Sequence, residues 1–485
     1  MNKIMKYALK ASFFFLILVG NSALAVTLDW SSASNLSATG EDSRQPRIAL
    51  SDDGTKATAT WYRYNGTNFI IQSASATIEK GIANWGSVTD LSATEENAQQ
   101  PEVEISSDGT KATAIWYRNN GSNDIAQSAS ATINGNVATW GSVTDLSVSG
   151  KDVRGHLEID LSSDGTKATA VWARYNGTDD IIQSASATIS GNTATWGSVS
   201  DLSAVGEGAS QADIAISLDG TKATAAWYRY NGTNSIIQSA SATINMNTAT
   251  WSASADLSAT GQNADDDPLV ELSSDGTVSA IIWARNDGTG NYIIQSAIAT
   301  ISGNTASWSS ATDLSATGES SFGGHIALSS DGSKVTAVWN RYNGSFNVNQ
   351  SASATIIMNT ATWGSTVNIS VDGADSNTPY VELSSDGLVA VAVWRRRNGD
   401  FNIIQAAQAV ISGNTATWNA ARNLSKTGQH ANDPKLALSS DGGKATVVWV
   451  RSDGVDRLVQ SASSPIDTSC FVIKSNTGKT IIFCL

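Results

Sequence analysis

A repeat of 55 or 56 residues runs through the chain and constrains its fold more than any other feature. The dipeptide Asp-Gly recurs eight times at this interval, and a tryptophan stands eight residues after each aspartate. A second tryptophan recurs once per repeat, so two per repeat account for all 16 tryptophans. Repeats of about this length are typical of solenoids and propellers, whose units bury their apolar faces against their neighbours. The repeated aspartates are Asp53, Asp108, Asp164, Asp219, Asp275, Asp331, Asp386 and Asp441.

Each repeat has the pattern of four short strands, which we call A to D. In the first repeat, strand A ends before Asp53-Gly54, strand B covers 56–64, strand C covers 69–77 and strand D covers 84–92. Asp-Gly and Asn-Gly turns separate the first three strands, and we expect type I′ turns with positive φ at both central residues. No helical periodicity intervenes, which disfavours helical and leucine-rich solenoids. The sequence therefore predicts an all-β fold, an eight-bladed β-propeller of four-stranded antiparallel blades.

The two ends of the repeat array complement each other. The array begins with a lone strand D, residues 27–37, and ends with strands A, B and C, residues 435–463. We predict that the N-terminal strand D joins the C-terminal A, B and C strands as one blade, which leaves no exposed edge. Two four-bladed rings are the alternative, but the spacing is unbroken at the middle of the chain, where a linker would be needed.

The first residues have the features of a secretory signal peptide. Residues 1–25 contain three lysines, the apolar run SFFFLILVG and an A-x-A cleavage site, so we expect cleavage after Ala25. No later apolar run is long enough for a membrane span. We therefore predict a secreted or periplasmic protein whose propeller covers residues 26–464, followed by a hairpin over residues 465–485.

The only two cysteines lie in this C-terminal hairpin. In an exported chain, Cys470 and Cys484 are expected to form a disulfide. A two-thiol metal site is the alternative, but no histidine lies near them in the sequence.

The charge of the chain limits its partners. There are 30 basic and 44 acidic residues, a formal net charge of −14. Such an acidic chain is not expected to bind nucleic acid or an anionic membrane. No cofactor-binding motif is present, and we expect a monomer without a cofactor.

The Asp-Gly hairpin carries a family resemblance. The motif S-x-D-G-x-K-x-x-A-x-W, present as SSDGTKATAVW at residues 162–172, resembles the S-P-D-G hairpin of WD40-like repeats in TolB-type propellers, with serine in place of proline. The resemblance implies an exported bacterial β-propeller but no particular ligand. A looser resemblance links the chain to sialidase-like propellers through their Asp-box, S-x-D-x-G-x-x-W, although here glycine follows aspartate directly and tryptophan comes later.

Some polar residues recur in every repeat. An arginine follows two residues after each strand B tryptophan, as Arg63 follows Trp61, and a glutamine such as Gln72 recurs in each strand C. Features common to all units usually serve the unit itself. We therefore expect these residues to be structural, with the arginine bonded to the glutamine of the neighbouring strand.

Two positions of strand A carry carboxylates that would face the channel. One interpretation explains these carboxylates without a ligand, as solvated charges in a water-filled lumen. The alternative is that they form a site for a cation or a cationic ligand. The three histidines, His156, His325 and His430, lie in different blades, so no shared metal site is expected. The first acidic row, four residues before the repeated aspartate, contains Glu104, Asp160, Glu271 and Glu382. The row two residues earlier contains Arg47, Glu102, Glu158, Asp213, Leu269, His325, Tyr380 and Lys435.

The D–A loops vary most between repeats, and in a propeller they share one face with the B–C turns. Loops on a rigid scaffold are where binding usually resides, and tyrosines beside amides suit stacking on sugar rings, although tyrosines also simply end strands. We predict that ligand-binding residues lie here: Tyr64, Tyr175, Tyr230 and Tyr342 at the ends of strand B, and Asp265, Asp266 and Asp267 in one D–A loop.

No catalytic motif names a reaction. The first hypothesis is an exported, non-catalytic propeller that binds a protein or glycan through the face formed by D–A loops and B–C turns. The alternative is a sialidase-like or lyase-type glycan enzyme whose carboxylates meet at the channel mouth. An enzyme would hold two carboxylates about 5–10 Å apart, with a partner arginine or tyrosine.

Overall fold

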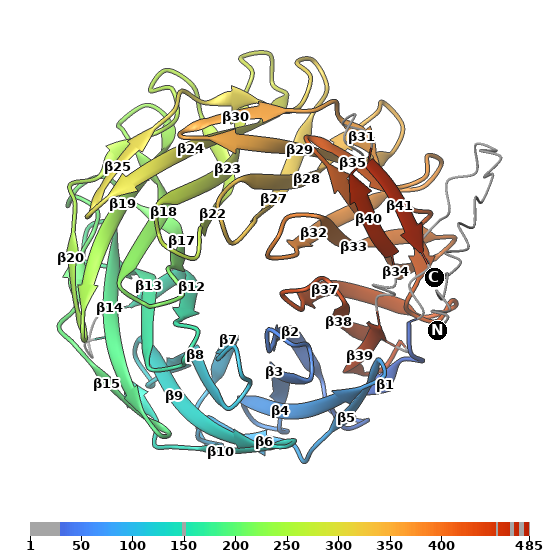
Figure 1. Cartoon of the computed structure of the whole chain (residues 1–485). Helices are drawn as coiled ribbons and strands as arrows, with labels where there is room; N and C mark the ends of the chain where they lie inside the picture. The colour runs from blue at the N-terminus through green and yellow to red at the C-terminus, as the bar shows by residue number, and fades with distance from the viewer. Residues whose placement is uncertain (1–29, 148–151, 453, 466–469, 475–479, 485) are drawn as a thin grey trace, which may run out of the picture.

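The computed structural model describes residues 30–147, 152–452, 454–465, 470–474 and 480–484, with the backbone alone for Asp265, Asp266 and the residues after Pro465. Eight antiparallel sheets surround a central channel, which confirms the predicted eight-bladed propeller (Figure 1). The predicted signal peptide lies outside the described residues. Within the described ranges, no helix is long and apolar enough to cross a membrane.

Each blade runs outward from the channel in the order A, B, C, D. The A strands line the channel: β2 (Ser43–Leu50), β7 (Ala98–Ile105), β12 (Val153–Leu161), β17 (Ser210–Ile216), β22 (Ala264–Leu272), β27 (Ser321–Leu328), β32 (Ser376–Leu383) and β37 (His430–Leu438). The B strands follow: β3 (Lys56–Tyr64), β8 (Lys111–Asn119), β13 (Lys167–Tyr175), β18 (Lys222–Tyr230), β23 (Val278–Asn286), β28 (Lys334–Tyr342), β33 (Val389–Asn398) and β38 (Lys444–Ser452). The C strands are β4 (Phe69–Glu79), β9 (Asp124–Asn134), β14 (Asp180–Ser190), β19 (Ser235–Asn245), β24 (Tyr292–Ser302), β29 (Asn347–Ile357), β34 (Phe401–Ser412) and β39 (Arg457–Pro465).

The outer strand D is interrupted in blades 1 to 7. In blade 1 it consists of β5 (Ile82–Trp85) and β6 (Thr89–Asp90), both paired with β4. The break begins at Gly86, where a Cβ atom would lie 2.1 Å from the backbone oxygen of Asn136 in the next blade, so only glycine fits. The other pairs are β10 (Val137–Trp140) and β11 (Thr144–Asp145), β15 (Thr193–Trp196) and β16 (Ser200–Asp201), β20 (Thr248–Trp251) and β21 (Ala255–Asp256), β25 (Thr305–Trp308) and β26 (Thr312–Asp313), β30 (Thr360–Trp363) and β31 (Val367–Asn368), and β35 (Thr415–Trp418) and β36 (Arg422–Asn423).

The N-terminal segment closes the ring as predicted. Strand β1 (Ser34–Asn35) pairs antiparallel with β39, which makes blade 8 a sheet in the order β1-β39-β38-β37. Two further backbone hydrogen bonds extend the pairing, from Ser31 N–H to the Ser463 oxygen and from Leu36 N–H to the Val459 oxygen, both 2.8 Å long.

The Asp-Gly turns differ from the predicted type I′ geometry. Gly54 has a φ of 62°, whereas Asp53 is not among the residues with positive φ, so the prediction of two positive φ angles is wrong. The Asp53 carboxylate instead accepts hydrogen bonds from the Ser51 hydroxyl and the Thr55 N–H, at 2.8 and 2.9 Å. An aspartate that bonds to the backbone two residues onward stabilises a turn without a left-handed conformation of its own.

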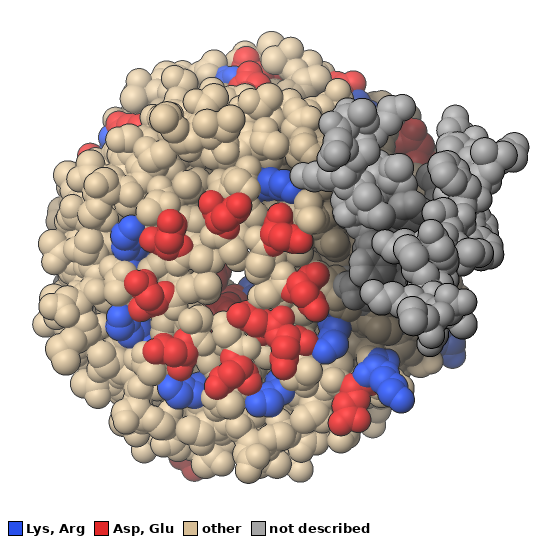
Figure 2. Space-filling model, in the orientation of Figure 1, with Lys and Arg blue, Asp and Glu red and all other residues tan. Residues whose placement is uncertain are grey.

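These turns also connect the blades around one opening of the channel. The Asp52 N–H donates to the Ser107 oxygen of the next blade, and the equivalent bonds continue around the ring until the Ser440 N–H donates to the Asp52 oxygen. In six blades the strand B lysine adds a bond to the next turn, as Lys56 Nζ does to the Asp108 oxygen at 3.0 Å. Figure 2 shows acidic and basic side chains gathered around this opening. We call this side of the propeller the turn face.

The C-terminal strands β40 (Cys470–Lys474) and β41 (Thr480–Cys484) form the predicted hairpin, a separate two-stranded sheet. The register places Cys470 opposite Cys484. Their side chains lie outside the described residues, so the disulfide stays a prediction.

Candidate functional site

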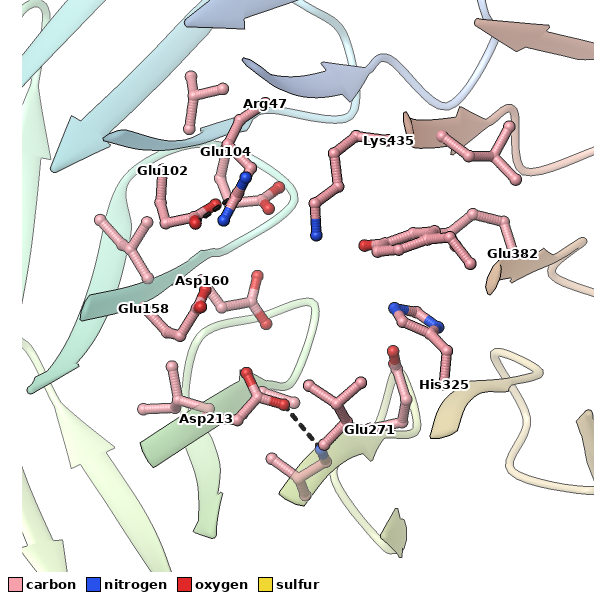
Figure 3. A pocket seen from close by; sticks show the side chains of 18 of the residues that line it. Arg47, Glu102, Glu104, Glu158, Asp160, Asp213, Glu271, His325, Glu382 and Lys435 are labelled. Carbon is pink, nitrogen blue, oxygen red and sulfur yellow. Dashed lines mark hydrogen bonds and ion pairs between the residues drawn. The ribbon is translucent and has the colours of Figure 1, made fainter. Parts of the chain in front are cut away.

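All seven predicted carboxylates meet in one cavity of about 320 Å³ inside the channel, which we call the lumen. They lie on the A strands, where alternate residues of each strand point inward. Figure 3 shows them around the lumen, on blades 2 to 5 and on blade 7. The four of the first row, Glu104, Asp160, Glu271 and Glu382, and the three of the second, Glu102, Glu158 and Asp213, all line the cavity.

The carboxylates of the lumen are partly buried rather than fully exposed to solvent. All seven carboxylate residues are half-buried, and the Glu102 side chain, for example, is only 14% exposed. Burial, together with the charges of Asp160 and other carboxylates, raises the pKa of Glu104 well above its usual range. Burial likewise raises the pKa of Asp160 to about 6, of Asp213 to about 7 and of Glu382 to about 8.

Backbone and side-chain donors hold several of the carboxylates. Asp160 accepts hydrogen bonds from the N–H groups of Leu161 (2.6 Å) and Ile216 (2.7 Å). Asp213 accepts one from the Val270 N–H at 2.7 Å. Glu102 forms an ion pair with Arg47. The A strands of neighbouring blades are thus bridged through lumen side chains, and these groups have a structural role.

Basic and aromatic groups occupy the other part of the second row. The rings of His325 and Tyr380 lie 3.7 Å apart between centroids, and Lys435 Nζ lies 4.7 Å from the centroid of the Tyr380 ring. Burial, and then the charge of Lys435, lowers the pKa of His325 to about 3. Burial, and then the charge of Arg47, lowers the pKa of Lys435 to about 8. At neutral pH, His325 is therefore uncharged, and Arg47 and Lys435 are the cations of this part of the lumen.

Among the described residues, no group of three or more His, Cys, Asp or Glu side chains is placed to hold a metal ion. The lumen carboxylates stand around a circumference rather than converging on one point (Figure 3). Calcium would need six to eight oxygen ligands at about 2.3–2.6 Å. The arrangement suits a polar organic molecule better than a metal ion.

The predicted tyrosines lie on the opposite side of the propeller from the turn face, which we call the loop face. A hydrogen bond from the Asn65 amide to the Thr94 oxygen, 2.9 Å long, joins a B–C turn to a D–A loop there. Three of the tyrosines are exposed, Tyr64 at 41%, Tyr230 at 49% and Tyr342 at 45%. Tyr175 is half-buried beneath the Arg154 guanidinium, 3.9 Å from the ring centroid.

The predicted acidic loop is described in part. Asp267 accepts a hydrogen bond from the Gln211 amide at 2.6 Å and lies 3.4 Å from Nδ1 of His156. It also lines a groove of about 600 Å³ together with Tyr228, Tyr292 and Phe322. The side chains of Asp265 and Asp266 lie outside the described residues.

The loop face also carries a set of exposed apolar side chains that the sequence did not predict. Around blades 6 and 7, Phe322, Phe346 and Phe401 are each 36% exposed, and Val371 is 67% exposed. For one of them, Phe346, the departure from the repeat pattern could have indicated an exposed apolar position. Phe346 stands where other blades carry an asparagine, namely Asn68, Asn123 and Asn234.

The recurring tryptophan, glutamine and arginine are structural, but the predicted arginine–glutamine bond is wrong. The buried Trp61 indole donates to Gln72 Oε1 at 3.0 Å, and the Gln72 amide donates to Asp90 at 2.7 Å. Arg63 instead pairs with Glu41 of the preceding loop, at 3.1 Å. The glutamine is already occupied by the indole and the outer strand, so the arginine is directed to the loop.

No protein-family model matches the chain, and no curated protein matches its sequence. Among solved structures, it is similar to the C-terminal WD40 domain of Sif2, with 12% identity, coverage of 91% of this chain and 99% of that one, and a TM-score of 0.49. The WD40 domain of SCAP from fission yeast gives 9% identity, coverage of 92% and 99%, and a TM-score of 0.47. An alpha-L-arabinanase from Penicillium chrysogenum gives 10% identity, coverage of 64% and 93%, and a TM-score of 0.38. These similarities assign neither a family nor an activity.

Proposed function

We propose that this chain is an exported, monomeric, non-catalytic binding propeller that recognises a protein or glycan partner through its loop face. The observation that carries the proposal is the set of exposed aromatic and apolar side chains on that face. Exposed apolar side chains that cluster on one surface commonly mark an interaction site. The opposite side also exposes apolar side chains, such as Ile357 and Met358 at 75% and 78%, but these are aliphatic residues of the C–D turns. On the turn face the repeated aspartates and most of the lysines already serve hydrogen bonds within and between blades.

The chemistry of the loop face favours a protein partner over a glycan. Tyrosine and phenylalanine are common anchors at protein interfaces and also stack on sugars. The exposed valines Val205 and Val371, 71% and 67% exposed, contribute only aliphatic surface. Aliphatic surface suits the apolar core of a protein interface better than the polar ring of a sugar.

The test is a binding screen of the mature protein against the exported proteins of its source and against a glycan array. The loop-face variant carries Tyr64→Ala, Tyr230→Ala and Tyr342→Ala. The control is Leu218→Ser on the turn face, because serine occupies this position in six other repeats. We expect the partner to bind wild type and the control, and to bind the loop-face variant at least tenfold more weakly with an unchanged melting temperature. Equal binding to all three proteins would contradict the proposal.

The glycan-enzyme alternative is supported by one observation in the lumen. Glu382, with its pKa raised to about 8 by burial, is a carboxyl group that stays protonated at neutral pH, as a general acid must. Arg47 and Tyr380 line the same cavity. The test is turnover of a sialoside or a uronate glycan by the wild-type protein. Turnover that disappears in the Glu382→Gln variant would favour an enzyme over a binding module.

A further inference from the structure

Charge is segregated within the lumen. The acidic side chains of blades 2 to 5 come from four consecutive A strands, β7, β12, β17 and β22. Blade 8 and blade 1 contribute the two cations, Lys435 from β37 and Arg47 from β2. The remaining carboxylate, Glu382, lies beside the cationic part, where Lys435 acts on its charge. Figure 3 shows Lys435 reaching into the lumen from the side opposite Asp213 and Glu271, whereas the Arg47 guanidinium lies beside Glu102.

Several of these charged groups have no direct partner in the described part of the chain. Lys435 contacts the face of the Tyr380 ring, and no carboxylate of the described residues forms an ion pair with its ammonium group, although Glu102, Glu158 and Asp433 act on its charge from a longer distance. The carboxyl groups of Glu158 and Glu271 make no hydrogen bond or ion pair among the described residues. Enclosed charges without partners are costly, and proteins commonly satisfy them with one another or with a ligand. Within the described residues, the lumen therefore presents a cation without an ion pair and carboxyl groups without a hydrogen-bond partner.

We propose that the lumen binds a small zwitterion that carries one ammonium group and one carboxylate, as amino acids and ω-amino acids do. The ligand carboxylate pairs with Lys435, and the ligand ammonium group lies among Glu158, Glu271 and their neighbours. A simple cation would satisfy the acidic side but leave Lys435 unpaired and add repulsion to it. A simple anion would pair with Lys435 but would leave the carboxyl groups on the other side of the cavity without a partner. A dipolar ligand matches both sides at once.

The size of the cavity agrees with such a ligand. Its volume of about 320 Å³ corresponds to roughly ten water molecules at about 30 Å³ each. Amino acids and short ω-amino acids have about five to ten non-hydrogen atoms and so fit this space. A bound ammonium group also offsets the mutual repulsion that, after burial, keeps the pKa values of Glu158 and Glu271 well above their usual range. This inference does not depend on the loop face, and the two proposals can fail separately.

Isothermal titration of the mature protein tests the proposal with a series of zwitterions from glycine to 6-aminohexanoate. Butylamine, 1,4-diaminobutane and butanoate are the probes that carry one kind of charge. We expect saturable binding of at least one zwitterion, at least tenfold tighter than that of any single-charge probe. Equal or tighter binding of an amine would identify a cation site and overturn the proposal. The absence of saturable binding across the whole series would identify a water-filled lumen and overturn it as well.

Two variants locate the site. Lys435→Leu removes the cation, and leucine already occupies this position in blade 5 as Leu269. The double variant Glu158→Gln with Glu271→Gln replaces two carboxyl groups, which can become carboxylates beside a bound ammonium group, by neutral amides of nearly the same volume. Each variant is expected to bind the zwitterion at least tenfold more weakly than wild type.

Controls separate local effects from loss of fold. Lys80→Met changes an exposed lysine where two other blades carry Met246 and Met358, and Glu79→Gln changes its exposed neighbour. Both are expected to bind like wild type. Melting temperatures of all proteins show which are folded, and a folded Lys435→Leu protein with unchanged affinity would contradict the assigned role of Lys435.

Discussion

The side-chain amide of Gln460 donates a hydrogen bond to Oδ1 of Asn35 over 2.9 Å, across 425 residues of sequence. In blade 1 the equivalent amide, that of Gln72, donates to Asp90 on its own outer strand at 2.7 Å. Asn35 thus occupies in blade 8 the position that Asp90 occupies in blade 1. The N-terminal segment is therefore a true outer strand, and the cooperative unit of the propeller includes both ends of the repeat array.

The first prediction concerns this closure. Leu36 and Leu91 occupy equivalent positions behind the outer strands of blades 8 and 1, and both are 7% exposed. We expect Leu36→Ala and Leu91→Ala each to lower the free energy of unfolding by about 2–5 kcal/mol, because each leaves a cavity in the core. Urea denaturation measures both. A cost below about 0.5 kcal/mol for Leu36→Ala alone would mean that the N-terminal strand does not close the ring. Deletion of residues 27–37 is the stronger form of the test and is expected to cause aggregation through the exposed edge.

The second prediction concerns the turns that connect the blades. Gly332 has a φ of +67°, and a Cβ atom there would lie 2.7 Å from Cβ of Val278 in the preceding blade. Gly344, in the B–C turn of the same blade, has a φ of +93° but no atom within 4 Å of its would-be Cβ. Both alanine variants suffer the backbone strain, and only Gly332→Ala adds a clash. We expect Gly332→Ala to be about 1–3 kcal/mol less stable than Gly344→Ala by thermal or urea unfolding, and equal stabilities would contradict the contact.

The third prediction concerns the buried bond between tryptophan and glutamine. In blade 2 the Trp116 indole donates to Gln127 Oε1 at 3.1 Å, and the Gln127 amide donates to Asp145 at 2.7 Å. Gln127→Leu leaves the indole N–H without an acceptor, which is expected to cost about 1–3 kcal/mol of stability. In blade 8 the Trp449 indole already has no hydrogen-bond partner among the described residues. Gln460→Leu is therefore expected to cost less, and the reverse order in urea unfolding would contradict this account.

The sequence predicted the fold well because the repeat expresses it eight times. The spacing of Asp53 and Trp61 placed strands A and B, and the unmatched strand D at the N-terminus predicted the closure. The type of the Asp-Gly turn was predicted wrongly, because the Asp53 side chain, rather than a left-handed backbone at Asp53, stabilises the turn. The break in strand D was not predicted; in blade 1 it begins at Gly86, which packs against Asn136 of the next blade, a contact that a single repeat does not show.

The sequence predicted which residues line the channel, but it did not predict their burial or their ion pairs. Counting back from each Asp-Gly placed the carboxylates in the channel. Their burial and the lack of a partner for Lys435 depend on how closely eight A strands approach the axis, which the repeat alone does not specify. The pairing of Arg47 with Glu102 joins different blades, so no single repeat indicates it.

The last prediction concerns the dependence of stability on pH. Six lumen carboxyl groups have pKa values above their usual range in the folded protein, chiefly because of burial. These groups are Glu104, Glu158, Asp160, Asp213, Glu271 and Glu382. In the unfolded chain they lose their protons near pH 4, whereas in the folded protein Asp213 does so at about 7 and Glu382 at about 8. Over that interval the folded state holds more protons than the unfolded state, so the free energy of unfolding decreases as the pH rises.

Two groups act in the opposite sense: His325 only below its unfolded pKa of about 6.5, because its folded pKa is about 3, and Lys435 only as the pH approaches its folded pKa of about 8, one group against six carboxyl groups. Between pH 6.5 and 8 the carboxyl groups therefore dominate, and we expect the melting temperature to fall across this interval. Asp213→Asn keeps an oxygen acceptor for the Val270 N–H but removes one of the groups that titrate here. This variant is expected to show a shallower decline, while Asp372→Asn, in an exposed D–A loop, keeps the wild-type slope. Calorimetric melting curves at pH 6.5, 7.0, 7.5 and 8.0 measure the slopes. A melting temperature that rises over this range, or an Asp213→Asn slope equal to that of wild type, would show that the lumen carboxyl groups are already ionised and solvated.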